Sequence, residues 1–175
     1  TNAQLTHLHN YLLTGGLMYK ITDVYNTKTV LSPLTLPTDI SREGIVEYQE
    51  YLQTLPGGFD LPVQHTFSDG VYAREAFLPK DSIVVGKIHR HGHLNIISRG
   101  KVVVVTEFGI QHLEGPITFV SKPGTKRVVR ALEDTQWTTI HLNESNTQDL
   151  AELEKQIIAT SYEQLEGEIL WLGEQ

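Results

Sequence analysis

Eight short segments rich in β-branched residues follow one another between Leu61 and Leu142, and they constrain the fold more than any other feature of this sequence. Turn residues such as Ser68-Asp69-Gly70 and Pro123-Gly124 separate them. The segments are Val63–Phe67, Val71–Leu78, Ile83–Ile88, Leu94–Ile97, Lys101–Thr106, Ile117–Val120, Arg127–Leu132 and Trp137–Leu142. Many short strands spaced by roughly 8–12 residues, with no helical pattern between them, predict an antiparallel sandwich or barrel and disfavour a parallel βαβ sheet.

Helical patterns flank this region on both sides. Leucines at helical spacing within residues 1–14 predict a short amphipathic helix, and an irregular stretch leads to a second apolar stripe formed by Ile45, Tyr48 and Leu52. After Asn143 a helical stripe returns with leucines and isoleucine at the same spacing. We therefore expect one compact domain with a mainly β fold. Its three parts are an N-terminal helical arm at 1–60, a β-barrel at 61–143 and a C-terminal helical tail at 144–175.

Composition excludes several classes of function. The chain has no cysteine, so disulfides, thiolate metal sites and cysteine nucleophiles are excluded. The net charge is −7, and the excess of acidic residues lies after Asn143, which argues against nucleic-acid binding. No apolar run approaches the roughly 20 residues that span a bilayer, so we expect no membrane segment. An acidic tail of this kind is typical of a solvated helix face, or less often of a docking segment for a basic partner.

A cluster of histidines lies at the junction of two predicted strands. His89 ends one strand, His93 begins the next, and His91 lies in the bend between them. Neutral imidazole is the commonest protein ligand for transition metals, and crowded histidines are costly to keep charged together. A tight bend would allow His89 and His93 to point into the same barrel mouth. The alternative is that they are ordinary polar residues at a barrel rim.

The segment Gly86–Gly100 resembles the first sequence motif of the cupin superfamily, whose members are small jelly-roll β-barrels. Counting back from Gly100, His93 falls at the motif's glutamate position, His89 at its second histidine and Lys87 at its first. A second alignment pairs His89 with His91 and leaves Asn95 near the glutamate position. We prefer the first alignment because the turn glycine is the best landmark.

The segment from Gly115 to Arg127 resembles a compressed second cupin motif. Arg127 stands where that motif has a metal-binding histidine, and a protonated guanidinium cannot bind a cation. If 127–132 and 137–142 form a hairpin that turns at Glu133-Asp134, Arg127 faces His141 directly. His141 would then supply the missing imidazole. The hypothesis is a metal site of His89, His93 and His141.

The stretch from about Val71 to His141 also resembles small cupin-like proteins of tailed phages. The resemblance rests on Gly86–His89, His93–Ile96, Pro123–Arg127 and Trp137–His141. It implies a viral context, with the protein in the host cytoplasm, or in the virion if it is structural. It implies no particular reaction.

Two classes of function remain open at this point. In the first, the three histidines hold a divalent Fe, Mn, Zn or Ni ion, and the site binds or acts on a small anionic ligand. Arg127 is then a candidate anchor for the anion and Glu107 a candidate general base. Arg74 is a weaker candidate: it anchors an anion if it faces inward, and the alternative is a salt bridge on the outer face. In the second, the chain is a non-catalytic assembly protein with a degenerate site. For either we expect a homodimer, and contacts with other chains through the N-terminal arm or the C-terminal tail.

Overall fold

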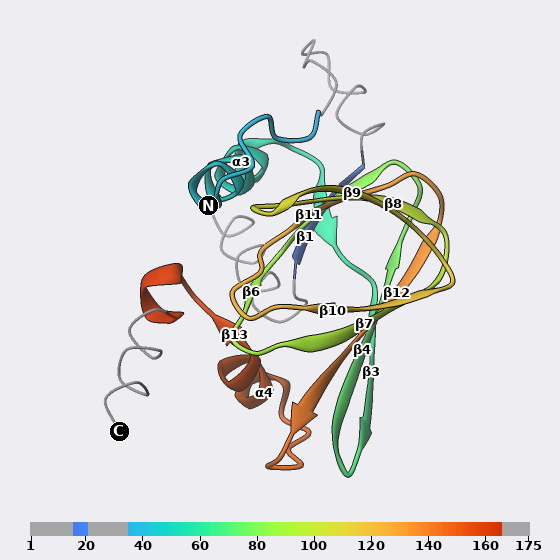
Figure 1. The fold of residues 1–175 in the computed structure, drawn as a ribbon, viewed down its shortest axis with the longest axis vertical. Coiled ribbons are helices and arrows are strands. Elements are labelled where there is room, and N and C mark those ends of the chain that lie inside the picture. The colour runs from blue at the N-terminus through green and yellow to red at the C-terminus, as the bar shows by residue number, and fades with distance from the viewer. Residues whose placement is uncertain (1–15, 21–34, 166–175) are drawn as a thin grey trace.

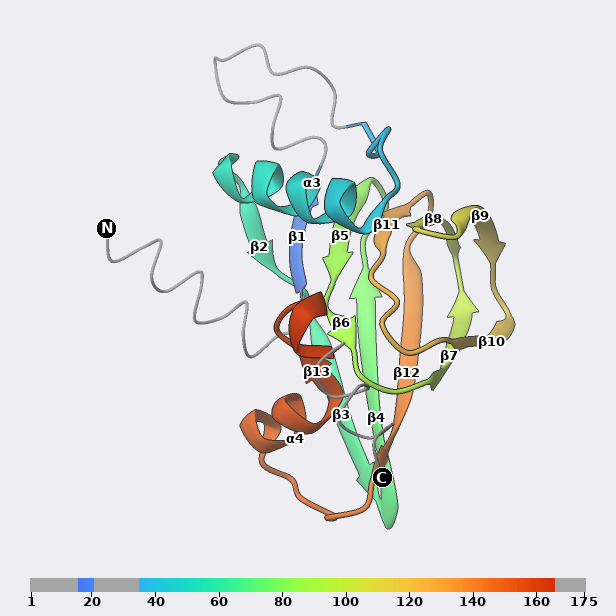
Figure 2. The same cartoon turned by 60° about the vertical axis from the view of Figure 1, so that its left-hand side comes forward.

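Two antiparallel sheets face each other and enclose the interior of this protein. The computed structural model describes residues 16–20 and 35–165. In Figure 1 the two sheets curve toward each other and close around a common interior, and Figure 2 shows the same sheets from the side. The prediction of a small, mainly antiparallel β-barrel is confirmed in these ranges.

The first sheet has six strands in the order β2-β1-β5-β11-β8-β9, and every neighbouring pair is antiparallel. The strands are β1 (Gly16–Lys20), β2 (Gly58–Asp60), β5 (Ser82–Gly86), β8 (Lys101–Thr106), β9 (Gly109–Glu114) and β11 (Val128–Ala131). The helix α3 (Arg42–Thr54) packs on its outer face.

The second sheet has five strands in the order β10-β7-β12-β4-β3, again all antiparallel. They are β3 (Val63–Ser68), β4 (Gly70–Leu78), β7 (His93–Arg99), β10 (Ile117–Ser121) and β12 (Thr135–Asn143). A short third pairing joins β6 (Ile88–His89) to β13 (Ile158–Ala159), which directly follows helix α4 (Leu150–Ile157).

The central strands β5, β8 and β11 of the six-stranded sheet are buried on both faces, and this explains their continuous apolar runs. In β5, Val84 faces the interior between the sheets, whereas Ile83 and Val85 pack toward α3. In β8, Val104 likewise faces the interior between the sheets, and Val105 packs toward α3. A strand with two buried faces loses the polar and apolar alternation of a half-exposed strand. These short runs therefore belong to central strands of the sheet.

The two helices confirm the sequence-based expectations for their apolar stripes. Ile45 and Leu52 of α3 are buried against the six-stranded sheet, and Ser41 caps the helix by accepting a hydrogen bond from the Gly44 amide (3.0 Å). Leu153 and Ile157 of α4 pack on the ring of Tyr72. The predicted helix within residues 1–14 lies outside the described residues.

The predicted hairpin of 127–132 with 137–142 is wrong. β11 pairs with β5 and β8, whereas β12 pairs with β4 and β7, so the two strands belong to different sheets. The connection between them does not close a tight turn. The amides of Leu132 and Glu133 instead donate to the carbonyl of Lys101, and the Asp134 carboxylate accepts from the Lys80 amide. The chain crosses between sheets here because each strand completes a different apolar face.

Four of the described strands, β1, β2, β9 and β13, lie where the sequence pattern predicts none. β1 lies in the stretch expected to be irregular, and it pairs with both β2 and β5. β9 alternates weakly because most of its residues are exposed at the sheet edge. Among the described residues, no helix is long and apolar enough to cross a membrane.

Candidate metal centre

Three histidines from three separate strands converge at one end of the interior. His89 lies in β6, His93 begins β7, and His141 lies near the end of β12. β7 and β12 are hydrogen-bonded neighbours, and the register pairs Leu94 with Ile140, so the flanking residues His93 and His141 share the inner face. Trp137, Thr139 and His141 alternate along β12 and all line the interior cavity.

The three imidazole rings are close enough to bind one ion. The ring centroids lie 4.3 Å apart for His89 and His93, 4.6 Å for His93 and His141, and 5.2 Å for His89 and His141. One nitrogen from each ring lies within 4.8 Å of the others. Within the described residues, these three histidines are the group of potential metal ligands whose nitrogen atoms lie close together. The geometry provides three facing neutral nitrogen donors.

The environment keeps all three imidazoles uncharged. Burial, followed by the charges of the neighbouring histidines, lowers the pKa of His89 well below its ordinary value. Burial lowers the pKa of His93 to about 4 and that of His141 to about 3. The nearby guanidinium of Arg127 lowers all three pKa values further. Neutral imidazole is the form that binds metals, so the ligands need not lose protons at neutral pH.

Two buried nitrogen atoms of this cluster have no hydrogen-bond partner among the residues that the structure describes. They are Nδ1 of His89 and Nε2 of His93. Buried polar atoms without a partner are rare in folded proteins, and each costs free energy unless a ligand, ion or water satisfies it. A cation bound among the rings would satisfy both nitrogens at once. The residues present therefore fit a divalent metal ion.

A cavity of about 130 Å³ adjoins the histidines. Its walls are mostly apolar and come from both sheets and from α4. Among the described residues, its charged lining consists of Arg74, Lys87 and Arg127 with one carboxylate, Glu154. The cavity thus combines an apolar body with a cationic rim next to the imidazoles.

Arg127 lies beside the cluster in a network of neutral partners. Its guanidinium donates to Asn95 Oδ1 (3.2 Å) and to Ser121 Oγ, and it stacks over the Trp137 ring at 5.5 Å. Burial lowers the pKa of Arg127 to about 10, so the group stays charged at neutral pH. Among the described residues no carboxylate forms an ion pair with it. A buried charge with only neutral partners is an attractive position for an anion.

The C-terminal segment is one wall of this site. Lys87 forms an ion pair with Glu154 of α4, and Ile158 of β13 pairs with His89 itself. The backbone amide of Arg90 donates to the carbonyl of Ile157 (2.8 Å), and its side-chain Nε donates to Ile158 (2.7 Å). These bonds hold α4 directly over the cavity. The acidic tail therefore contributes at least one carboxylate to the site.

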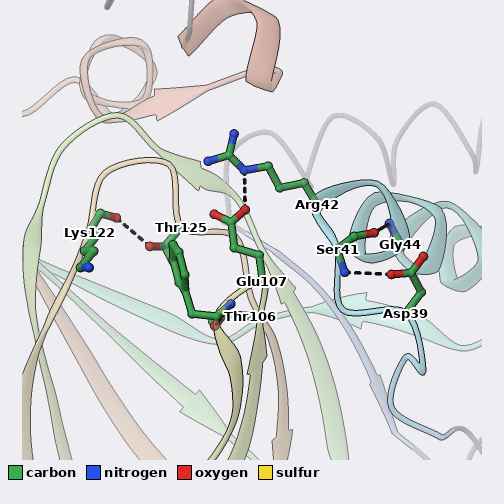
Figure 3. A network of polar contacts seen from close by, with 9 residues as sticks. Asp39, Ser41, Arg42, Gly44, Thr106, Glu107, Lys122 and Thr125 are labelled. Carbon is green, nitrogen blue, oxygen red and sulfur yellow. Dashed lines mark hydrogen bonds and ion pairs between the residues drawn. The ribbon is translucent and has the colours of Figure 1, made fainter.

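Glu107, proposed as a general base, lies away from the cavity. It directly follows β8, and its Oε2 accepts a hydrogen bond from Arg42 Nε at 2.5 Å, as Figure 3 shows. Glu107 is not among the residues that line the cavity. The ion pair joins the N-terminal end of α3 to the end of β8, which is a structural contact. The geometry gives this carboxylate no access to the histidine cluster.

The other sequence candidates, Arg74 and His91, and two further histidines, His65 and His112, are divided between the interior and the surface. Arg74 lines the cavity, as the inward alternative proposes. His91 and His112 are exposed, and neither belongs to the cluster. His65 Nδ1 lies 2.7 Å from the hydroxyl of Tyr72, whose ring stacks near that of His141.

Sequence reasoning named Tyr72 only as a weak polar candidate. It missed Lys87 as a cavity-lining group and Glu154 as the carboxylate supplied by α4. Tyr72 carried a usable signal, because it occupies the same strand face as Arg74. Glu154 carried no such signal in the sequence, because its position depends on how α4 packs back against the cavity.

Comparisons with known proteins reveal similarity in structure alone. No family model matches the sequence, and no curated protein matches it. Similar solved structures include an acetylacetone dioxygenase from Acinetobacter johnsonii, with 17% identity over 47% of this chain and 60% of that one at a TM-score of 0.41. A cupin 2 conserved barrel domain protein from Salinispora arenicola has 14% identity over 53% of this chain and 84% of that one, at 0.42. The ectoine synthase from P. lautus has 9% identity, covering 55% and 71%, at 0.45.

These similarities are distant, and the chain spans less than two thirds of the length of the dioxygenase that it matches. Identities and TM-scores this low carry no activity from one protein to another. The fold and the site are established by this chain's own strands and side chains.

Proposed function

We propose that this chain is a metal-binding cupin-fold protein that holds one divalent ion on His89, His93 and His141 and binds or acts on a small anionic ligand beside it. The observation that carries the proposal is the meeting of three neutral imidazoles, two of them with buried nitrogens that have no other partner in the described part of the chain. Three protein ligands leave open coordination positions, which is the arrangement typical of a catalytic or ligand-binding metal site. The phage context implied by the sequence resemblance is part of the same proposal.

The chemistry of the donors suits Fe²⁺, Mn²⁺, Zn²⁺ or Ni²⁺, since nitrogen ligands of this kind bind all four. A bound ion would supply Lewis-acid polarisation of a ligand oxygen or activation of a water molecule. The chain's own residues would hold the ion, exclude water from the apolar side of the cavity and orient an anion through Arg127. The facing imidazoles favour this function over an assembly protein with a degenerate site.

Metal content tests the proposal directly. Protein purified without a histidine tag, stripped with a chelator and reloaded with one of the four ions, should hold about one ion per chain by elemental analysis. The variants His93→Ala and His141→Ala should each lose at least tenfold in metal affinity, because each removes one of three ligands.

Two exposed histidines provide matched controls. His91→Ala lies in the same bend as His89 and His93, and His112→Ala lies on the edge strand β9, and both should bind the ion as wild type does. Wild-type protein that takes up no ion, or histidine variants that keep full affinity, would disprove the proposed metal site.

A further inference from the structure

The cavity beside the histidine cluster has two chemically different ends. Leu61, Leu78, Val84 and Val129 form an apolar wall between the sheets. Leu153 of α4 also lines the cavity, where it packs with Tyr72. The imidazoles and the cationic side chains lie at the other end. A molecule that fits this space needs an apolar body and one polar or charged group.

The size of the cavity limits the size of the body. Its volume is about 130 Å³. An apolar cavity of about 150 Å³ in another protein accommodates benzene, so the body should hold about six carbon atoms or fewer. Long acyl chains and sugars are too large for this space while α4 remains in place.

The charge at the polar end selects an anion. Arg127 is 8% exposed, and its hydrogen-bond partners in the described structure, Asn95 and Ser121, are neutral. Its planar guanidinium matches the two oxygens of a carboxylate. A phosphate dianion is more strongly hydrated, and the mostly apolar walls would not replace that hydration.

We propose that this cavity binds a small monocarboxylate, with its carboxylate between the histidine cluster and Arg127 and its apolar body between the sheets and α4. This inference rests on the proposed function, because the bound ion and Arg127 together supply the charge that the carboxylate neutralises. It adds the class of ligand, which the metal site alone does not define.

Calorimetric titration of the metal-loaded full chain tests the inference with four probes. We expect 3-methylbutanoate to bind, and its neutral analogue 3-methylbutanamide to bind at least tenfold more weakly. Inorganic phosphate, which has the charge without the apolar body, should also bind at least tenfold more weakly. Decanoate, which has the carboxylate on a body too long for the cavity, should not bind.

Substitutions at Arg127 separate two properties of its guanidinium: its charge, and the fork of two parallel N–H groups that matches a carboxylate. Arg127→Lys keeps the charge and removes the fork, and it should weaken binding of 3-methylbutanoate at least fivefold while metal content stays at one ion. Arg99→Lys, on the exposed side of β7, is the matched control and should bind as wild type does. If Arg127→Lys does not fold, the comparison of acid and amide on wild-type protein decides the matter alone.

The outcomes distinguish this inference from the proposed function. Metal content is measured on each sample before titration, so a protein without metal overturns the proposed function. A fully loaded protein that ignores 3-methylbutanoate, or that binds the amide equally well, overturns only the carboxylate inference. Tight binding of phosphate without binding of the acid would show an inorganic anion site and would also overturn it.

Discussion

Asn95 is a single buried side chain that connects the polar groups of the interior. It is 0% exposed, and its Oδ1 accepts hydrogen bonds from Arg127 (3.2 Å) and from the indole of Trp137 (3.0 Å). Its Nδ2 donates to Ser121 (2.8 Å). Because Arg127 is buried, its orientation toward the cavity depends on this amide and on the Ser121 hydroxyl.

We predict that Asn95→Ala lowers the free energy of unfolding by about 2–4 kcal/mol, because it leaves a buried indole N–H and a guanidinium N–H without an acceptor. Urea denaturation of the metal-free protein measures this change. Ser98→Ala, at an exposed position of the same strand, should change the free energy by less than about 0.5 kcal/mol. Equal effects of the two substitutions would contradict the role given to Asn95.

At the scale of elements, helix α4 and β13 cover the cavity and are anchored to β6, the strand that carries His89. Leu153 is 1% exposed and packs with Tyr72 and Ile157, and β13 pairs with the strand of His89. Asp149 caps the helix at its N-terminus, where its carboxylate accepts hydrogen bonds from the amides of Ala151 and Glu152. The position of the cavity wall therefore depends on apolar packing and on backbone pairing together.

We predict that Leu153→Ala destabilises the protein by about 2–4 kcal/mol and speeds hydrogen exchange of the amides in α4 and β13. The lost packing leaves a void beneath the helix, so local opening should become easier than global unfolding. Lys155→Ala, on the exposed side of the same helix, should leave both quantities near the wild-type values. An exchange pattern in α4 that does not change would show that Leu153 does not hold this cover.

At the scale of the whole molecule, the histidine cluster makes stability depend on pH. Burial lowers the folded-state pKa of His93 to about 4 and that of His141 to about 3, while an unperturbed histidine titrates near 6.5. Between these values the unfolded chain binds more protons than the folded protein. The free energy of unfolding therefore rises with pH across this window. The stability that the neutral histidines contribute is lost as the pH falls from 6.5 toward 4.

We predict that metal-free wild-type protein is markedly less stable at pH 4.5 than at pH 7.5, as urea denaturation at the two values measures. His141→Gln removes one of the buried imidazoles, so its stability should change less between the same two pH values. His112→Ala, whose ring is exposed, should keep the wild-type dependence. A wild-type protein of equal stability at both pH values would contradict the neutral state of the cluster.

The path to His141 shows what the sequence could and could not predict about the site. Its inward orientation follows from alternation along β12, which is a local property. The predicted hairpin with 127–132 does not form, because β12 pairs with β4, the strand of Tyr72, and with β7, the strand of His93. The position of Glu107 is equally non-local, because its ion pair with Arg42 joins residues far apart in the chain.

The sequence by itself determined the class of fold, because turn residues and β-branched segments act over a few neighbouring residues. It also determined the available chemistry, since a chain with histidines and no cysteine can offer a metal only nitrogen and oxygen ligands. Only the tertiary structure decided which strands become neighbours and that α4 closes over the cluster. Those outcomes depend on how distant apolar faces are buried together, and no local periodicity contains that information.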